Sequence, residues 1–215
     1  MTDSTMPSAS GAHAVIGVHT PVPFATIAST PEGLALARRV RMVVLDVDGV
    51  LTDGGIYLGD VAGQRLEFKR YDIQDGLGMK MLQKAGIKVA IITGRVSESV
   101  SLRARELGVD EVFQDTHARK LPALRSMLVR HGLELGEVAF VGDDLPDVGP
   151  MRAVALSVAV ANASPDGTQA ARFVLTREGG RGAVREFAEG LLRARGEWDA
   201  LSDWYVRSRD REDDA

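Results

Sequence analysis

Cysteine is absent from the 215 residues of the sequence. Its absence excludes disulfides, thiolate metal sites, iron–sulfur clusters and cysteine nucleophiles together. A reducing compartment is compatible with such a chain, and we expect the cytoplasm. A strong excess of one charge is also lacking, because 26 Lys and Arg face 30 Asp and Glu, for a net charge of −4. Nucleic-acid-binding proteins concentrate basic residues on one face, so we expect no DNA or RNA partner.

Long apolar runs are missing as well. The longest stretch without a formal charge, Ser4 to Pro31, is interrupted by four prolines and by many serines and threonines, whereas a membrane-spanning helix needs about 20 consecutive, mostly apolar residues. We expect no membrane segment, and the basic start of a secretory signal is absent too. We predict a weakly ordered extension over residues 1–30, one compact domain over 31–195 and a C-terminal tail over 196–215.

The central part alternates short apolar runs with stretches of helical periodicity. Apolar runs of the kind that form strands buried on both faces lie at 41–47, 87–93, 111–114, 138–142, 155–160 and 173–176. Helical spacing fills 77–85, 100–107 and 121–129, and Gly86, Gly108 and Gly132 follow where a helix C-terminus favours glycine. The pattern predicts an α/β fold with a Rossmann-like parallel sheet flanked by helices.

One segment departs from this alternation. Residues 56–58 and 65–68 flank the sequence Gly-Asp-Val-Ala-Gly, which predicts a β-hairpin. It would project from the sheet just after the first strand.

Acidic and polar residues follow the predicted strands at the edge where parallel sheets bind ligands. Asp46 and Asp48 end the first strand, and Asp143, Asp144 and Asp147 follow the strand at 138–142. Paired carboxylates repel each other, and a cluster of oxygen ligands without His or Cys suits Mg²⁺. The sequence therefore predicts a magnesium site.

Magnesium in turn suggests a phosphate substrate. Thr93 ends the second strand, and Lys120 begins a helix at the same edge. A hydroxyl and an ammonium are the groups needed around phosphoryl oxygens, and an aspartate could form an aspartyl phosphate. An Asp-x-Asp alone could belong to a glycosyltransferase or a simple turn, Lys120 could be a solvated side chain, and Asp144 could be a helix N-cap. The order of all four segments favours catalysis.

These residues resemble a known family. Asp46-Val47-Asp48-Gly49-Val50-Leu51-Thr52, Thr93-Gly94-Arg95, Lys120 and Gly142-Asp143-Asp144-Leu145-Pro146-Asp147 look like the four motifs of the haloacid dehalogenase superfamily. The segments 51–55, 75–78 and 179–186 are similar to its 3-deoxy-D-manno-octulosonate 8-phosphate phosphatases. The resemblance covers roughly residues 41–194. It implies a phosphatase of lipopolysaccharide biosynthesis.

The resemblance also implies a role for each matching residue. Asp46 matches the nucleophile and Asp48 the general acid and base. Asp46, the backbone carbonyl of Asp48 and Asp143 would hold Mg²⁺. Thr93 and Lys120 match the groups that bind the phosphoryl group. Asp144 and Asp147 would support the metal indirectly, through the groups around it.

Spacing indicates that the chain has no cap domain, because the intervals from Asp48 to Thr93 and from Thr93 to Lys120 are too short for one. An open site suits a macromolecular substrate or an oligomer whose neighbours close it. The resemblance favours a homotetramer in which the C-terminal segment, with Arg181, reaches a neighbour's site. Alternatively, residues 179–182 are a flexible lead into the helix at 182–195.

Substrate identity rests on fewer residues. The resemblance implies that Asp75, Gly76, Lys80 and Arg95 contact the sugar acid, although Lys80 and Arg95 could equally be exposed surface charges. Gln74 stands where the family usually has a basic residue. A nonulosonate 9-phosphate or another phosphate ester therefore stays an alternative substrate. A silent module that binds a sugar acid or drives assembly is a third interpretation, against which the presence of Asp48 argues.

Overall fold

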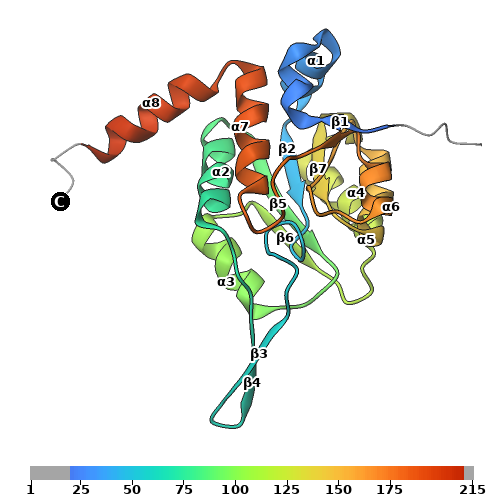
Figure 1. The fold of residues 1–215 in the computed structure, drawn as a ribbon, viewed down its shortest axis with the longest axis vertical. Coiled ribbons are helices and arrows are strands. Elements are labelled where there is room, and N and C mark those ends of the chain that lie inside the picture. Colours follow the sequence, from blue (N-terminus) through green and yellow to red (C-terminus); the bar gives the residue numbers. More distant parts are fainter. Residues whose placement is uncertain (1–19, 211–215) are drawn as a thin grey trace, which may run out of the picture.

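A parallel sheet organises the chain, as the alternating pattern predicts. The computed structural model describes residues 20–210. Seven strands form one parallel sheet in the order β1-β9-β8-β7-β2-β5-β6 (Figure 1). They are β1 (Val22–Pro23), β2 (Met42–Leu45), β5 (Lys88–Thr93), β6 (Glu111–Gln114), β7 (Val138–Gly142), β8 (Leu156–Ala159) and β9 (Phe173–Val174).

The central strand β2 shows why these apolar runs form strands. All four of its residues are buried, and it pairs with β5 on one side and β7 on the other. Val43 and Leu45 point into one apolar cluster, while Met42 and Val44 point into the other. Side chains alternate along a strand, so a strand covered by helices on both faces needs apolar residues throughout.

Helices cover both faces of the sheet. The first cluster contains buried side chains of α1 (Pro31–Arg39), α2 (Ile73–Lys84), α3 (Glu98–Leu107) and α7 (Ala183–Arg195). The second contains those of α4 (Lys120–His131) and α5 (Leu145–Ala153). A short α6 (Pro165–Ala170) contacts α5. Within residues 20–210 we find no helix with the length and apolar character required to cross a membrane.

Glycines end the helices at the predicted places. Gly108 and Gly132 occupy the C-cap positions of α3 and α4 in the left-handed conformation, and Gly86 follows α2 with a φ of 78°. Such backbone angles cost glycine little. Each helix therefore turns back toward the next strand where the sequence analysis placed its end.

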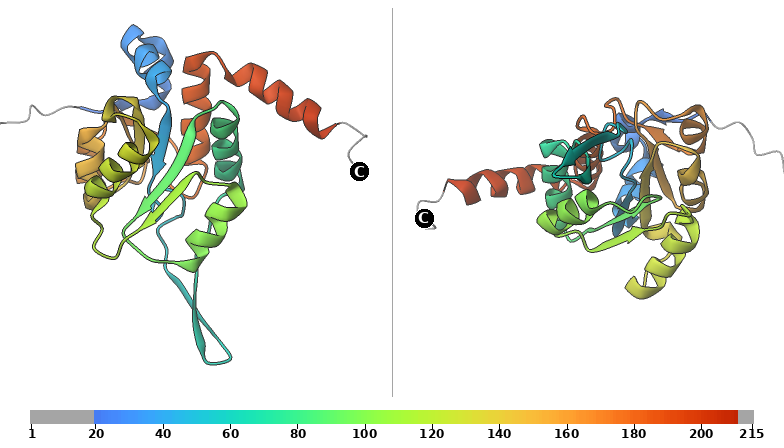
Figure 2. Two further views of the ribbon diagram at one scale, coloured as in Figure 1. Left: turned by 180° about the vertical axis from the view of Figure 1, so that it is seen from behind. Right: turned by 90° about the horizontal axis from the view of Figure 1, so that it is seen from below.

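The predicted hairpin is present. Strands β3 (Tyr57–Val61) and β4 (Gln64–Phe68) pair antiparallel as a separate two-stranded sheet, joined at Ala62 and Gly63, which both have positive φ. Figures 1 and 2 show the hairpin extending away from the parallel sheet. The hairpin carries exposed apolar side chains, among them Leu58 near its base, which is 70% exposed, and Val61 near its tip, which is 59% exposed.

The N-terminal boundary differs from the expected one at about residue 30. β1 adds to β9, and the 3₁₀ helix η1 (Phe24–Ser29) buries Phe24 and Ile27. The centroid of the Phe24 ring lies 5.2 Å from the centroid of the Phe187 ring in α7. Two large apolar side chains fix this segment to the domain although it has no periodic pattern. Residues 1–19 of the predicted extension lie outside the described residues.

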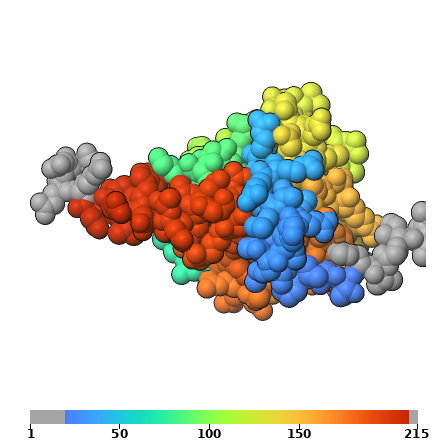
Figure 3. Space-filling view, turned by 90° about the horizontal axis from the view of Figure 1, so that it is seen from above, coloured from blue at the N-terminus to red at the C-terminus, as the bar shows by residue number. Residues whose placement is uncertain are grey.

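The C-terminal segment also differs from a simple tail. After α7, the helix α8 (Trp198–Arg209) covers most of residues 196–210. Trp198 is buried, whereas Trp204 is 42% exposed. In Figure 3 the C-terminal helices, drawn red, extend to one side of the domain, and Figure 1 shows α8 projecting sideways from the upper part of the molecule and the hairpin projecting from its lower end.

Candidate active site

Three neighbouring strands deliver the central residues of the site. Asp46 follows β2, Thr93 ends β5 and Asp143 follows β7, and these strands are adjacent in the order β7-β2-β5. Because they run parallel, their carboxyl ends lie at one edge. Lys120 begins α4 and is also buried at this edge. The predicted assembly of four motifs is therefore present in the fold.

The loop after Asp46 turns sharply, and its sequence explains why. The backbone N–H and the hydroxyl of Thr52 both donate to the carbonyl of Val47, at 3.0 and 3.2 Å. Gly49 has a φ of 93°, which other residues rarely adopt. A β-carbon at Gly49 would also lie 2.1 Å from Oδ2 of Asp143. The glycine thus lets this loop approach the carboxylates of the next motif.

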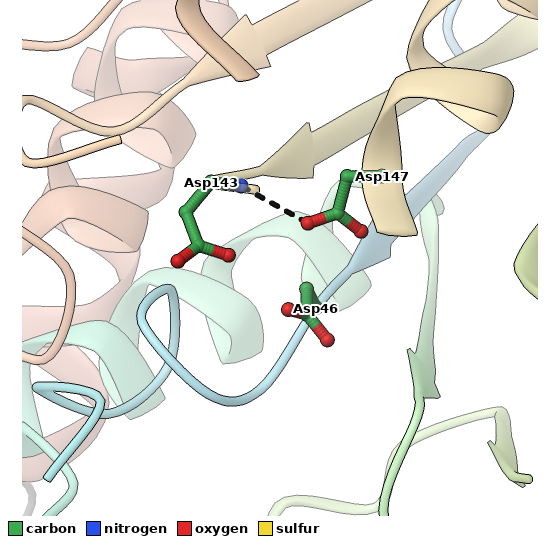
Figure 4. A group of neighbouring side chains, drawn as sticks. All are labelled: Asp46, Asp143 and Asp147. Atoms are coloured by element: carbon green, nitrogen blue, oxygen red, sulfur yellow. Dashed lines mark hydrogen bonds between the residues drawn. The ribbon is translucent and has the colours of Figure 1, made fainter. Parts of the chain in front are cut away.

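Three carboxylates converge at this edge. Asp46, Asp143 and Asp147 each offer an oxygen, and these oxygens lie within 4.8 Å of one another. Figure 4 shows the three side chains together, with the backbone N–H of Asp143 donating to Oδ2 of Asp147 at 3.1 Å. Asp147, for which we predicted an indirect role, lies in this cluster, with Oδ1 paired with Lys120 and Oδ2 accepting from Asp143. The side chain of Asp48, two residues from Asp46, is not among the three.

Lys120 neutralises part of this charge. Its ammonium lies 2.7 Å from Oδ1 of Asp46 and 2.7 Å from Oδ1 of Asp147. Burial alone would lower the pKa of Lys120, but the two carboxylates raise it, so the ammonium stays charged. Burial raises the pKa of both Asp46 and Asp143, and repulsion from the neighbouring carboxylates adds to the effect. One ammonium among three carboxylates leaves net negative charge.

A hard cation fits the remaining charge. Oδ1 of Asp143 is buried and has no hydrogen-bond partner within residues 20–210. The donors are all carboxylate oxygens, which Mg²⁺ prefers. A cation would stabilise the charged forms of Asp46 and Asp143, which burial and repulsion disfavour. The cluster is therefore suited to a divalent metal.

Thr93 and Asp144 take up the expected positions. Thr93 is only 2% exposed, and its hydroxyl accepts from the backbone N–H of Arg95 at 3.3 Å. Asp144 is exposed at the N-cap position of α5, and its backbone N–H lies 3.4 Å from Oδ2 of Asp147. Asp144 thus contacts the cluster through its backbone and begins the helix that carries Asp147.

The carboxylate of Asp48 faces residues that the sequence analysis missed. Lys69 forms an ion pair with Oδ1 of Asp48, and Nε of Arg95 lies 4.0 Å from Oδ2. Glu67 contacts both cations, at 3.2 Å from Lys69 and 2.5 Å from Arg95. The structure therefore brings Arg95 to Asp48. A signal was present, because Glu67 and Lys69 are two residues apart at the end of a strand and so face one side.

Two residues that we predicted to contact the substrate, Asp75 and Gly76, also have structural contacts. Asp75 is 1% exposed and accepts from the backbone N–H groups of Arg185 at 2.8 Å and Gly182 at 3.4 Å. It thereby ties the start of α2 to the start of α7. A β-carbon at Gly76 would lie 2.5 Å from Arg103 of α3, so Gly76 makes room for packing. Neither residue joins the carboxylate cluster.

Lys80 also lies apart from the cluster. It is exposed on α2 near Gly108, the residue at which α3 ends. Helix α3 begins beside the carboxyl end of β5 and runs back toward the other edge of the sheet. The structure therefore places Lys80 near the opposite edge from Asp46.

The glycine-rich loop before α7 packs on its own chain. Gly180 donates to the carbonyl of Val50 at 3.0 Å, and a β-carbon at Gly179 would lie 1.7 Å from the carbonyl oxygen of Gly49. This loop therefore supports the loop that follows Asp46. The side chain of Arg181 is 59% exposed, with Glu178 at 3.4 Å. Its predicted contact with a neighbour's site stays a prediction.

Comparisons with known proteins agree with this geometry. Residues 113–186 match the family of haloacid dehalogenase-like hydrolases. The 3-deoxy-D-manno-octulosonate 8-phosphate phosphatase KdsC of Escherichia coli K12 is 43% identical over 166 residues, which cover 77% of this chain and 86% of the relative. The Yersinia pestis KdsC is 41% identical over 158 residues, 74% of this chain and 82% of the relative.

Solved structures show the same fold. The Moraxella catarrhalis 3-deoxy-D-manno-octulosonate 8-phosphate phosphatase, in complex with magnesium, phosphate and KDO, superposes with a TM-score of 0.75 at 37% identity. The match covers 80% of this chain and 97% of the other. The cobalt-bound Haemophilus influenzae phosphatase gives a TM-score of 0.73 at 33% identity, covering 80% and 99%.

Proposed function

The chain belongs to the family of 3-deoxy-D-manno-octulosonate 8-phosphate phosphatases within the haloacid dehalogenase superfamily, and we propose that it is a Mg²⁺-dependent phosphatase of a sugar acid phosphate. The substrate is 3-deoxy-D-manno-octulosonate 8-phosphate. One observation carries the proposal: Asp46, Asp143 and Asp147 converge beside Lys120 in a chain that matches these phosphatases over most of its length.

In the first step, Asp46 is the nucleophile. One of its carboxylate oxygens attacks phosphorus, and the bond from phosphorus to the sugar oxygen breaks. The ammonium of Lys120, 2.7 Å from Oδ1 of Asp46, holds the carboxylate of the nucleophile in place. Asp48, in its protonated form, gives a proton to the leaving sugar oxygen. The products are the free sugar acid and an aspartyl phosphate on Asp46.

In the second step, water replaces Asp46 on phosphorus. Asp48 now takes a proton from the water as the oxygen attacks, and the bond between phosphorus and the Asp46 oxygen breaks. Inorganic phosphate leaves, and Asp46 and Asp48 return to their starting states. Thr93 and Lys120 bind the phosphoryl oxygens in both steps, because their hydroxyl and ammonium lie at the edge where the reaction takes place.

The carboxylate cluster supplies the metal site. Asp46 and Asp143 would hold Mg²⁺ together with the backbone carbonyl of Asp48, which the family resemblance adds, and Asp147 and Asp144 would lie around them. Bound there, Mg²⁺ supplies positive charge that offsets the charge of the carboxylates and of the transferring phosphoryl group. Among this chain's own residues, Asp147 keeps Lys120 in position at 2.7 Å.

We also propose a homotetramer that acts in the cytoplasm in lipopolysaccharide biosynthesis. The projecting hairpin supports an oligomer, because Ile56, Leu58, Val61 and Phe68 are 60%, 70%, 59% and 52% exposed. Apolar side chains gathered on a protruding element favour burial against a partner. Sedimentation analysis tests the assembly, and replacing Leu58 with Asp should shift the protein toward smaller species.

Phosphate release from a panel of substrates tests the activity itself. The panel contains 3-deoxy-D-manno-octulosonate 8-phosphate, a nonulosonate 9-phosphate and simple hexose phosphates. We expect Mg²⁺-dependent release from the first, with the highest kcat/KM. A higher kcat/KM for the nonulosonate 9-phosphate would identify that compound as the substrate, an alternative that Gln74 leaves open. Release of phosphate from no compound in the panel would refute the proposed phosphatase activity. The Asp46→Asn variant controls for contaminating phosphatases.

A further inference from the structure

The foot of the hairpin contacts the proposed proton donor. Glu67 near the end of β4 and Lys69 just after it lie beside Asp48, in the loop that follows β2. Within residues 20–210, the polar contacts of the Asp48 carboxylate come from Lys69 and Arg95. Its orientation is therefore set by the hairpin foot and the loop after β5, not by the carboxylate cluster.

Lys69 is buried to an unusual degree for a lysine. Its side chain is 2% exposed, whereas those of Asp48 and Glu67 are 27% and 25% exposed. A buried ammonium is costly unless it is paired, and Lys69 has two carboxylate partners. A lysine that served only solubility would remain in water, so its burial ties the end of the hairpin to Asp48.

Glu67 links the two cations around Asp48. One of its oxygens lies 3.2 Å from the ammonium of Lys69, and the other lies 2.5 Å from a guanidinium nitrogen of Arg95. Lys69 and Arg95 in turn flank the two oxygens of Asp48. Each of the two carboxylates in this group of four residues lies within 4.0 Å of both cations. The arrangement limits rotation of the Asp48 side chain.

We propose that Lys69, held by Glu67, is a positioning residue that fixes the carboxyl group of Asp48 for proton transfer to the leaving oxygen. The inference rests on the proposed function. The loop that carries Asp48 contains Gly49 in a positive-φ conformation, and the charged contacts of its carboxylate come from elsewhere in the chain. A general acid contributes about 10²- to 10⁴-fold to the rate, and this contribution depends on its placement.

The test compares the release rates of two leaving groups in single-turnover experiments, in which the enzyme is in excess over the substrate. A sugar alkoxide needs a proton as it leaves, whereas p-nitrophenolate leaves readily without one. In Lys69→Met, we expect release of the sugar acid to slow by about 10²-fold and the first release of p-nitrophenolate from p-nitrophenyl phosphate to change little. In Glu67→Gln, release of the sugar acid should also slow more than release of p-nitrophenolate, but by a smaller factor than in Lys69→Met. Asp48→Asn, which lacks the proton donor itself, should show the largest difference between the two rates.

A matched control and a chemical rescue separate positioning from damage to the fold. Lys88→Met removes a partly exposed lysine that lies 3.9 Å from Asp110 at the other edge, and both rates should stay at the parent's level. Because the chain has no cysteine, Lys69→Cys can be alkylated at one place with 2-bromoethylamine. The thiolate displaces bromide and leaves an ammonium on a side chain of nearly lysine length. We expect the slow step to recover.

The outcomes distinguish the two proposals. Equal losses for both leaving groups in Lys69→Met, or no loss for either, would overturn the positioning role. If the alkylated Lys69→Cys protein did not recover the rate of sugar acid release, although mass spectrometry showed complete modification, the positioning role would be overturned too. Absence of any sugar acid phosphate hydrolysis by the parent, with p-nitrophenyl phosphate still cleaved, would instead overturn the proposed substrate.

Discussion

Replacing Lys120 with Met tests whether its ammonium holds the carboxylates together. The side chains of Lys120, Asp46 and Asp147 are 4%, 7% and 0% exposed, and both ion pairs measure 2.7 Å. Met keeps much of the apolar length of the side chain but removes the charge. Three neighbouring carboxylates, with Asp143 as the third, would then lie together without a cation from the protein.

The size of the effect follows from burial. Removing one partner of a buried ion pair typically destabilises a protein by about 3–5 kcal/mol, because the other charge stays buried without compensation. In a protein of this size each kcal/mol corresponds to a change of about 2–4 °C in Tm. We therefore expect the Tm of Lys120→Met to fall by about 6–20 °C in a metal chelator. Turnover should fall by at least about 10²-fold.

Thermal unfolding with chelator and with Mg²⁺ is the assay, and Lys88→Met is the control. Lys88 forms a distant, partly exposed pair of 3.9 Å with Asp110, and such pairs contribute about 0–1 kcal/mol. Because the carboxylates of Lys120→Met lack their ammonium, Mg²⁺ should raise its Tm more than that of the parent. A fall no larger than that of Lys88→Met would refute the reasoning that Lys120 compensates buried charge.

Three further changes test other parts of the site. Asp46→Asn should fold but release no sugar acid in single-turnover assays, because an amide is a poor nucleophile; near-normal release would contradict the mechanism. Gly49→Ala should weaken Mg²⁺ binding measured by calorimetry, because its β-carbon would lie 2.1 Å from Asp143 Oδ2; unchanged affinity would show that the loop adapts. Burial raises the pKa of Asp75 from 3.8 to about 6, so its stabilising contribution is full below about pH 4 and is lost as the pH rises through 6. Urea unfolding should show that the parent loses up to about 3 kcal/mol more than Asp75→Asn between pH 4 and 7; parallel pH profiles would argue against a perturbed Asp75.

The sequence predicted the sheet and the carboxylate cluster for physical reasons. A strand buried on both faces must be apolar at every position, as β2 is, and such a run is visible without tertiary information. Parallel strands place their carboxyl ends at one edge, so Asp46, Thr93 and Asp143 could be assigned to the same place from their order alone. The direct membership of Asp147 in the cluster depends on the turn of α5, which spacing did not specify.

Other parts could not be predicted in this way. The segment 22–29 has a two-residue strand and a six-residue 3₁₀ helix, too short for any periodicity, and its place is fixed by the contact of Phe24 with Phe187. Asp75 and Lys80 stand in a matching motif, yet Asp75 binds the backbone at the start of α7 and Lys80 lies near Gly108. A motif identifies residues, but their direction follows from packing.

The hairpin shows the limit most clearly. Alternation along β4 predicts two faces, but a strand with no contact to the core gives no indication of which face is inward. In the structure Phe68 is 52% exposed, while the side chain of Lys69 is 2% exposed because it contacts Asp48. The usual rule that apolar side chains point inward is reversed here, since the inward side meets a charged site. An ion pair between residues 21 positions apart therefore decides the orientation, and only the folded chain brings its partners together.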